Sequence, residues 1–363
     1  MRMDLLTVVA LSMLPASRSR AASAFKDIRH LTGLECDAAL DRVLQACELD
    51  PSERAAAIEV ARERASAALV AAKTACIEAL SWNDPRYPAL LSCIPDPPPV
   101  LWSRGNLDCL ARPAVAIVGS RAATPYALDV AYRLGQELSD RGIVVTSGLA
   151  RGVDSAAHRG CLSGCEPTVA VLGSGLDRVY PSQHTELASE ISKKGLLISE
   201  LGPGAAPLPE HFPLRNRIIS GISLGVVVVE ASEKSGSLIT ARCALEQGRD
   251  VMAVPGNVLS GRNRGSHGLL KDGAKVVESA DDILEGLGWP AGDAPRAMPS
   301  KLLQSDSLLG RMEAGEVYRL DELMELTGVA GTRLLARLME LELAGLVTNT
   351  GAGFSRTSVN VGS

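Results

Sequence analysis

One segment of this chain is Val115-Ala116-Ile117-Val118-Gly119-Ser120-Arg121, an apolar run that stops abruptly at glycine and serine and is followed by a helix-like stretch. The same pattern recurs at residues 143–148, 169–175, 196–200, 226–230 and 251–256. Short, unbroken apolar runs are typical of strands buried on both faces of a parallel sheet. The sequence therefore predicts an α/β fold with a parallel sheet as its core. In such sheets ligands bind beyond the carboxyl ends of the strands.

The composition is that of an ordinary globular protein, and 363 residues are enough for two or three domains. Aromatic residues make up 3% of the chain, so binding through many stacked rings is disfavoured, and contacts with nucleic acid would rest on backbone phosphates. The net charge of -5 does not favour nucleic acid globally, although a summed charge does not reveal a local basic patch. No apolar run approaches the length needed to span a bilayer, so no membrane partner is expected.

The cysteines are scattered and include no Cys-x-x-Cys pair, which predicts reduced thiols in a cytoplasmic protein. His158, Cys161 and Cys165 fall on neighbouring helical turns, but no fourth ligand is evident, so structural roles are favoured over a metal site.

The N-terminus imitates a secretion signal, with an apolar run over residues 5–14. We expect it not to be one, because Asp4 weakens the basic start and arginines precede the supposed cleavage site.

Four parts are predicted along the chain. Residues 1–75 are predicted to form a small helical domain, and residues 76–289 are predicted to form the extended domain that contains the parallel sheet. Residues 290–300 lack apolar periodicity and are predicted to be a linker. Residues 301–363 are predicted to form a winged-helix domain.

The winged-helix prediction rests on helix-like segments at 302–312, 320–326 and 331–345, followed by a β-hairpin with a glycine turn at 346–356. The third helix carries Thr332, Arg333 and Arg337. It also carries Glu340 and Glu342, which favour a protein-contact or structural role over reading of a DNA groove. This leaves open an alternative function, that of a protein adaptor acting through its winged helix.

Several strand ends and helix starts carry groups suited to an anion. Glycine permits close backbone approach, N–H groups at a helix start attract negative charge, and guanidinium matches the geometry of phosphate. An alternative stays open, in which the arginines pair with carboxylates such as Glu200 or Glu230. The candidate binding residues are Gly119, Ser120, Arg121, Ser147, Gly148, Arg151, Gly152, Arg215, Asn216, Arg217, Lys234, Ser235, Gly236 and Ser237.

No nucleophile and base stand at a known motif spacing, and both the dinucleotide fingerprint and the Walker A motif are absent. The sequence therefore predicts a protein that is not an enzyme, with no catalytic residue and no cofactor.

Five motifs occur in an order that resembles the DNA processing protein A family, also called DprA or Smf. They lie densely between residues 82 and 285. The motifs are Val118 to Arg121, Ser147 to Asp154 with Ala157-His158, Phe212 to Gly221, Ser235 to Ala241, and Ala253 to Gly256.

This resemblance implies a Rossmann-like core domain and an N-terminal domain of the SAM or helix-hairpin-helix type. It also implies a protein that binds single-stranded DNA, works as a homodimer, protects incoming DNA and loads the RecA recombinase in natural transformation and homologous recombination. It also implies that Arg121, with the glycine and serine before it, holds phosphate. Arg217 with Arg215 and Asn216, and Lys234 with the serines after it, would complete a basic pocket.

The chain departs from the family pattern at two places. His267 stands where an asparagine is usual, and the N-terminal module lacks the usual glycine-containing hairpin signal. A rival hypothesis is an enzyme similar to the lysine-decarboxylase-like phosphoribohydrolases. Their Pro-Gly-Gly-x-Gly-Thr run is replaced here by residues 235–240.

Overall fold

The computed structural model describes residues 3–14, 36–46 and 50–289. In the C-terminal part it describes residues 308, 311–312, 317–327, 331, 334–335, 337–338, 341, 347–349 and 353–356. The predicted linker at 290–300 lies outside the described residues. The chain divides into two compact units, residues 1–296 and 297–363. Across the described ranges, no helix combines the length and the apolar character that a bilayer-spanning segment needs.

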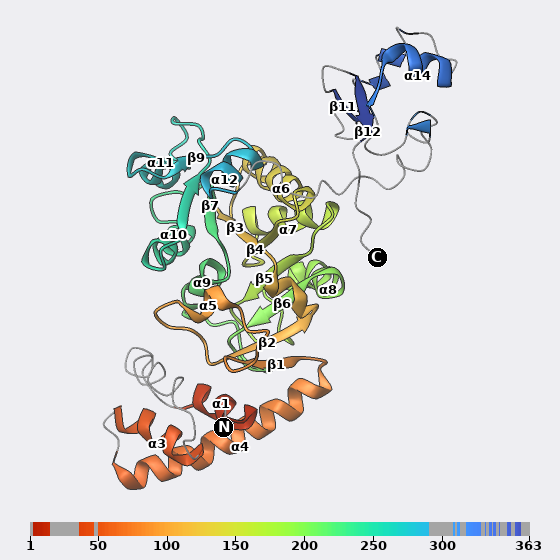
Figure 1. The fold of residues 1–363 in the computed structure, drawn as a ribbon. Coiled ribbons are helices and arrows are strands. Elements are labelled where there is room, and N and C mark those ends of the chain that lie inside the picture. The colour runs from red at the N-terminus through yellow and green to blue at the C-terminus, as the bar shows by residue number, and fades with distance from the viewer. Residues whose placement is uncertain are drawn as a thin grey trace. The chain divides into compact units, whose positions relative to one another are not determined.

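The first unit is built on a nine-stranded sheet (Figure 1). The predicted parallel strands are confirmed, and they run in the order β6-β5-β4-β3-β7-β8. Strand order reverses between β3 and β7, the kind of point at which open α/β sheets bind ligands. The strands are β3 (Ala114–Gly119), β4 (Val144–Ser147), β5 (Thr168–Leu172), β6 (Leu196–Ser199), β7 (Gly225–Val229) and β8 (Asp250–Ala253).

The edges of the sheet carry three strands that the sequence does not predict. β9 (Lys275–Val276) pairs with β8 in parallel, whereas β2 (Val100–Gly105) is antiparallel to β6 and β1 (Glu78–Ser81) is antiparallel to β2. Between β1 and β2 lies the Pro-rich stretch, which also contains α5 (Ala89–Ser92). Tyr87 of this stretch and Trp102 of β2 are buried.

β3 separates two cores, because side chains along a strand point alternately to opposite faces. Val115 and Ile117 belong to a buried cluster with residues of α6, α7 and α12, whereas Ala116 and Val118 belong to a second cluster with residues of α8, α9 and α10. Burial on both faces explains the unbroken apolar run. The helices are α6 (Pro125–Asp140), α7 (Val153–Ser163), α8 (Thr185–Lys194), α9 (His211–Gly221), α10 (Ser237–Glu246) and α12 (Ala280–Gly286).

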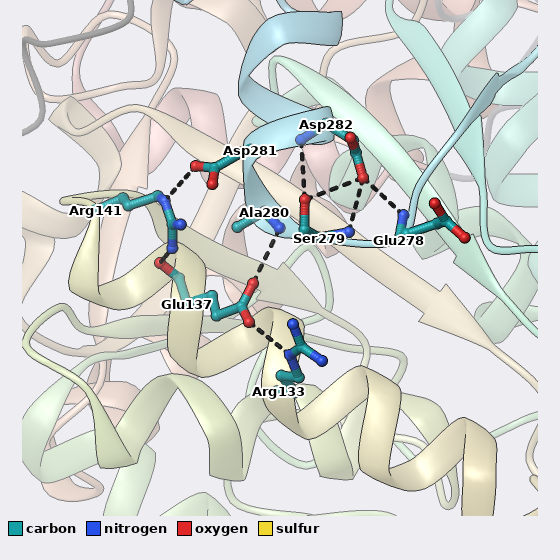
Figure 2. A network of polar contacts seen from close by, with 8 residues as sticks. All are labelled: Arg133, Glu137, Arg141, Glu278, Ser279, Ala280, Asp281 and Asp282. Carbon is teal, nitrogen blue, oxygen red and sulfur yellow. Dashed lines mark hydrogen bonds and ion pairs between the residues drawn. The ribbon is translucent and has the colours of Figure 1, made fainter.

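A polar network fastens α12 to α6 (Figure 2). The Glu137 carboxylate of α6 accepts a hydrogen bond from the Ala280 N–H at 3.0 Å. The Asp282 carboxylate accepts from the N–H and the hydroxyl of Ser279 at 2.8 and 3.0 Å. N–H groups at a helix start have no partner within the helix, so these carboxylates stabilise the first turn of α12.

The described residues before β1 are mostly helical, as predicted. They form α1 (Leu5–Ser12), α3 (Cys36–Ala46) and α4 (Pro51–Thr74), and both α1 and α4 contact β1. Val8 and Val9 of α1 lie in the same buried cluster as Trp102 of β2. These helices therefore share a core with one edge of the sheet.

The second unit has the elements of the predicted winged helix. α14 (Leu320–Thr327) is the predicted short helix, and β11 (Val347–Asn349) pairs antiparallel with β12 (Phe354–Arg356) as the predicted hairpin. β10 (Val317–Tyr318) pairs with the other side of β12. Within the predicted third helix, Leu334, Leu338 and Leu341 are buried in one cluster. The predicted helix at 302–312 lies largely outside the described residues, as do positions 332, 333, 340 and 342.

Candidate nucleic-acid interface

A cavity of about 350 Å³ lies beyond the carboxyl ends of β3 and β7, where the strand order reverses. We call it the main cavity. The turn after β3, one side of α9 and the turn from β7 into α10 line it, so segments far apart in the sequence meet there. The predicted residues in its lining are Gly119, Ser120, Arg121, Arg215, Asn216, Ser235, Gly236 and Ser237.

Two glycines allow the turn after β3 to pack closely. A Cβ on Gly119 would lie 1.9 Å from the carbonyl oxygen of Val229 on the neighbouring strand. Gly152 has a φ of +77°, and a Cβ there would lie 2.2 Å from the carbonyl oxygen of Ser120. The Ser120 N–H in turn donates to the Glu230 carbonyl at 2.8 Å. The backbone of this turn is therefore fixed by its neighbours.

Arg121 follows this turn and is exposed. Its guanidinium carbon lies 5.6 Å from the centre of the Phe212 ring, a distance suited to a cation–π contact. Among the residues that the structure describes, no carboxylate forms an ion pair with Arg121. The charge of Arg121 is therefore available to an anion.

Arg215 has a different role, because it is buried beneath the cavity. Its guanidinium donates to the carbonyl oxygens of Gly148 and Val171, and a Cβ on Gly148 would lie 2.2 Å from the Nη2 of Arg215. Burial lowers the pKa of Arg215 to about 10, which still leaves it charged at neutral pH. The neighbouring Asp154 accepts the Gly148 N–H at 3.1 Å, and burial raises the pKa of this carboxyl. Arg215 thus braces the ends of β4 and β5 and places a positive charge under the cavity.

Arg217 does not line the main cavity. Its Nη2 lies 2.6 Å from Glu200 Oε1 and its Nε lies 3.2 Å from Asp96 Oδ2. The pairing with Glu200 that the sequence left open is therefore formed. A role for Arg217 in binding nucleic acid stays a prediction.

The start of α10 faces the main cavity. Ser235 Oγ lies 2.8 Å from Ser237 Oγ, and the Asn216 amide donates to the Gly236 carbonyl at 3.4 Å. N–H groups and the dipole at a helix start favour an anion there. Lys234 is exposed and outside the lining of the cavity.

The remaining predicted residues lie at the end of β4 and in the turn after it. Ser147 is fully buried and its hydroxyl donates to the Ile117 carbonyl at 2.6 Å, so it links β4 to β3. Gly148 and Arg151 line a smaller second cavity of about 220 Å³.

Sequence reasoning missed two aromatic residues, Phe212 and Tyr180. Their ring centres lie 5.4 Å apart, and Phe212 lines both cavities whereas Tyr180 lines the second. The sequence could have indicated Phe212 through its helical spacing from Arg215 and Asn216. It lies on α9 three and four residues before Arg215 and Asn216, so the three share one helix face.

His158 and His267 both form hydrogen bonds within the fold. His158 Nδ1 lies 2.7 Å from the Thr168 hydroxyl, which donates its only proton to the Val145 carbonyl, so Nδ1 is the donor. Burial lowers the pKa of His158 to about 3, and the ring is neutral. On α11 (Arg264–Lys271), His267 Nε2 lies 3.1 Å from the Gly256 carbonyl oxygen. Within the described ranges, no three His, Cys, Asp or Glu side chains gather where a metal ion could bind.

Family models match both parts of the chain. The model described as "DNA recombination-mediator protein A" matches residues 78–288, and the model described as "DprA winged helix domain" matches residues 292–353. The chain is 41% identical over 280 residues to Protein Smf of Escherichia coli, a match that covers 74% of this chain and 75% of that protein. It is 47% identical over 201 residues to DNA processing protein DprA of Streptococcus pneumoniae, which covers 55% of this chain and 71% of that protein.

Two solved structures are similar to this fold. The X-ray structure of DprA from Streptococcus pneumoniae matches with a TM-score of 0.68 at 36% identity, covering 78% of this chain and 98% of that one. The DNA processing protein A of Helicobacter pylori, whose structure concerns its single-stranded DNA binding mode, matches with a TM-score of 0.53 at 30% identity. That match covers 58% of this chain and 95% of the other.

Proposed function

The chain belongs to the DNA recombination-mediator protein A family, and from this premise we propose that it binds single-stranded DNA without turning it over. The groups that line the main cavity are the main support for this proposal. Arg121, which has no carboxylate partner among the described residues, lines this cavity together with the first residue of α10. The charged side chain of Arg215 lies beneath it. A phosphate group of a nucleic-acid backbone fits this combination.

Binding is favoured over catalysis because both nearby carboxylates already serve the backbone. Asp154 accepts the Gly148 N–H, and Glu230 accepts the Thr124 hydroxyl at 2.6 Å and the Thr124 N–H at 3.2 Å. Both carboxylates therefore have structural roles at the turns beside the main cavity. This argues against the phosphoribohydrolase hypothesis, which predicts release of a base from nucleoside monophosphates.

Single strands are favoured over duplex because of the aromatic rings at the site. Phe212 and Tyr180 offer ring faces beside the phosphate-binding groups, and bases can stack on such rings only when they are not paired within a duplex. The Helicobacter pylori relative, described by its single-stranded DNA binding mode, supports the same choice.

We expect Arg121→Ala to weaken binding of oligo(dT) by roughly tenfold or more, because a charge-assisted phosphate contact is lost. The dependence of affinity on salt should also become shallower, by about 0.7 in log–log slope for each contact removed. Fluorescence anisotropy with labelled single strand and duplex over a salt series measures both quantities. Arg159→Ala is the matched control, since Arg159 is an exposed arginine of α7 outside both cavities. Equal affinity of Arg121→Ala and wild type would refute the proposal.

We further propose that the protein acts in the cytoplasm as a homodimer that protects incoming DNA and loads RecA during transformation and recombination. The family membership supports this part. The expected results are a dimer in sedimentation velocity and faster RecA filament assembly on single strands already coated with single-strand-binding protein. A monomer with no effect on RecA would contradict it.

A further inference from the structure

The second cavity lies beside the main cavity, on the β4 and β5 side. The two cavities share Arg121, Ala150, Phe212 and Arg215 in their linings. The Arg121 guanidinium and the Phe212 ring, which contact each other, thus belong to a common wall. The rest of the second cavity comes from the turn after β4 and from residues 180–183.

The lining of the second cavity has the chemistry that recognises a nucleotide. It contains arginines, two aromatic rings and the amide of Gln183, but no carboxylate. Arg151 is exposed, and in the described part of the chain no carboxylate pairs with it. Tyr180 is 48% exposed, so much of its ring is free to stack. Guanidinium binds phosphate, an exposed ring stacks on a base, and an amide both donates and accepts hydrogen bonds.

The loop that carries Tyr180 and Gln183 is held in place. The ring of His184, buried at the end of this loop, has its Nδ1 2.9 Å from the Leu149 carbonyl oxygen, close to Arg151 in the chain. Before the loop, the Ser174 hydroxyl donates to the Arg178 carbonyl at 2.7 Å. A site whose walls are already ordered loses less entropy when a ligand binds.

We propose that the second cavity is a second nucleotide subsite, which takes the nucleotide adjacent to the one held in the main cavity. Arg151 binds its phosphate and Tyr180 stacks on its base, while Arg121 in the shared wall faces both nucleotides. This inference rests on the proposed function, because it requires that a single strand occupies the main cavity.

The test uses the full chain and fluorescein-labelled oligo(dT) in anisotropy titrations over a salt series. Arg151→Ala and Tyr180→Ala are each expected to weaken binding by roughly tenfold, and Arg151→Ala to reduce the salt slope by about 0.7. Tyr180→Phe keeps the ring and should bind like wild type, as should Arg159→Ala, which removes a charge elsewhere. A 2-aminopurine placed in the strand should lose fluorescence when it stacks, and this quenching should weaken in Tyr180→Ala.

The possible results separate the two proposals. If wild type binds the single strand and Arg121→Ala does not, but Arg151→Ala and Tyr180→Ala bind like wild type, the second subsite is overturned and the proposed function stands. If wild type itself shows no preference for the single strand, both are overturned. Thermal unfolding of each variant shows whether it is folded, and a loss of affinity with an unchanged melting temperature supports the subsite.

Discussion

Arg215→Met is expected to lower the free energy of unfolding by about 3 kcal/mol, because two buried carbonyl oxygens lose a charged hydrogen-bond donor. The variant would leave the buried Asp154 carboxylate without its neighbouring cation. It would also leave the carbonyl oxygens of Gly148 and Val171 without the donor that Arg215 supplies. Methionine fills much of the same volume, so the loss is mainly electrostatic.

Urea unfolding followed by circular dichroism measures this loss. The double variant Arg215→Met with Asp154→Asn should recover part of it, because the uncompensated carboxylate is then gone, and a double-mutant cycle gives the coupling between the two side chains. A loss below about 1 kcal/mol in the single variant would show that Arg215 does not brace the strand ends.

Gly119→Ala is expected to destabilise the protein by about 3 kcal/mol, at the upper end of the cost of overpacking. The new Cβ would lie 1.9 Å from the Val229 carbonyl oxygen and 2.7 Å from a methyl group of Val153. The first of these atoms belongs to the backbone of a paired central strand, so it cannot move aside without breaking the ladder between β3 and β7. Denaturant unfolding gives the stability directly.

Gly236→Ala is the matched control for this prediction. Nothing lies within 4 Å of a Cβ at Gly236, and its φ of -62° suits alanine. Its stability should therefore stay within about 0.5 kcal/mol of wild type. Equal stability of the two variants would mean that the close approach of β3 and β7 relaxes without cost.

The sequence predicts the parallel strands because each is buried on both faces and so carries an unbroken apolar run. The strands β1, β2 and β9 lack this pattern, and the sequence does not predict them. Prolines precede β2, and β9 has only two residues, Lys275 and Val276, both exposed. The order of the strands cannot be obtained from periodicity either. It is the adjacency of β3 and β7 that brings Arg121 and Ser237 to the same cavity.

Within the site, the sequence indicated which segments line the main cavity but did not indicate the direction of each side chain. Successive residues of a helix are rotated by about 100°, so Phe212, Arg215, Asn216 and Ile219 share the face that lines the main cavity. Arg217 is rotated by about 200° from Arg215 and therefore pairs with Glu200 on the other side. Treating the arginines of this segment as one basic group overlooked that rotation, which the sequence alone could have revealed once the start of α9 was known.

The main cavity is lined by residues from Val118 to Thr240, supplied by segments that follow β3, β4 and β7 and by α9. No single hairpin or helix contains it, so it exists only while the central strands are paired. A ligand that binds only the folded state adds its binding free energy to the global unfolding equilibrium. The stability of the sheet and the occupancy of the main cavity are for this reason thermodynamically linked. A ligand bound in the cavity therefore protects the whole sheet against unfolding.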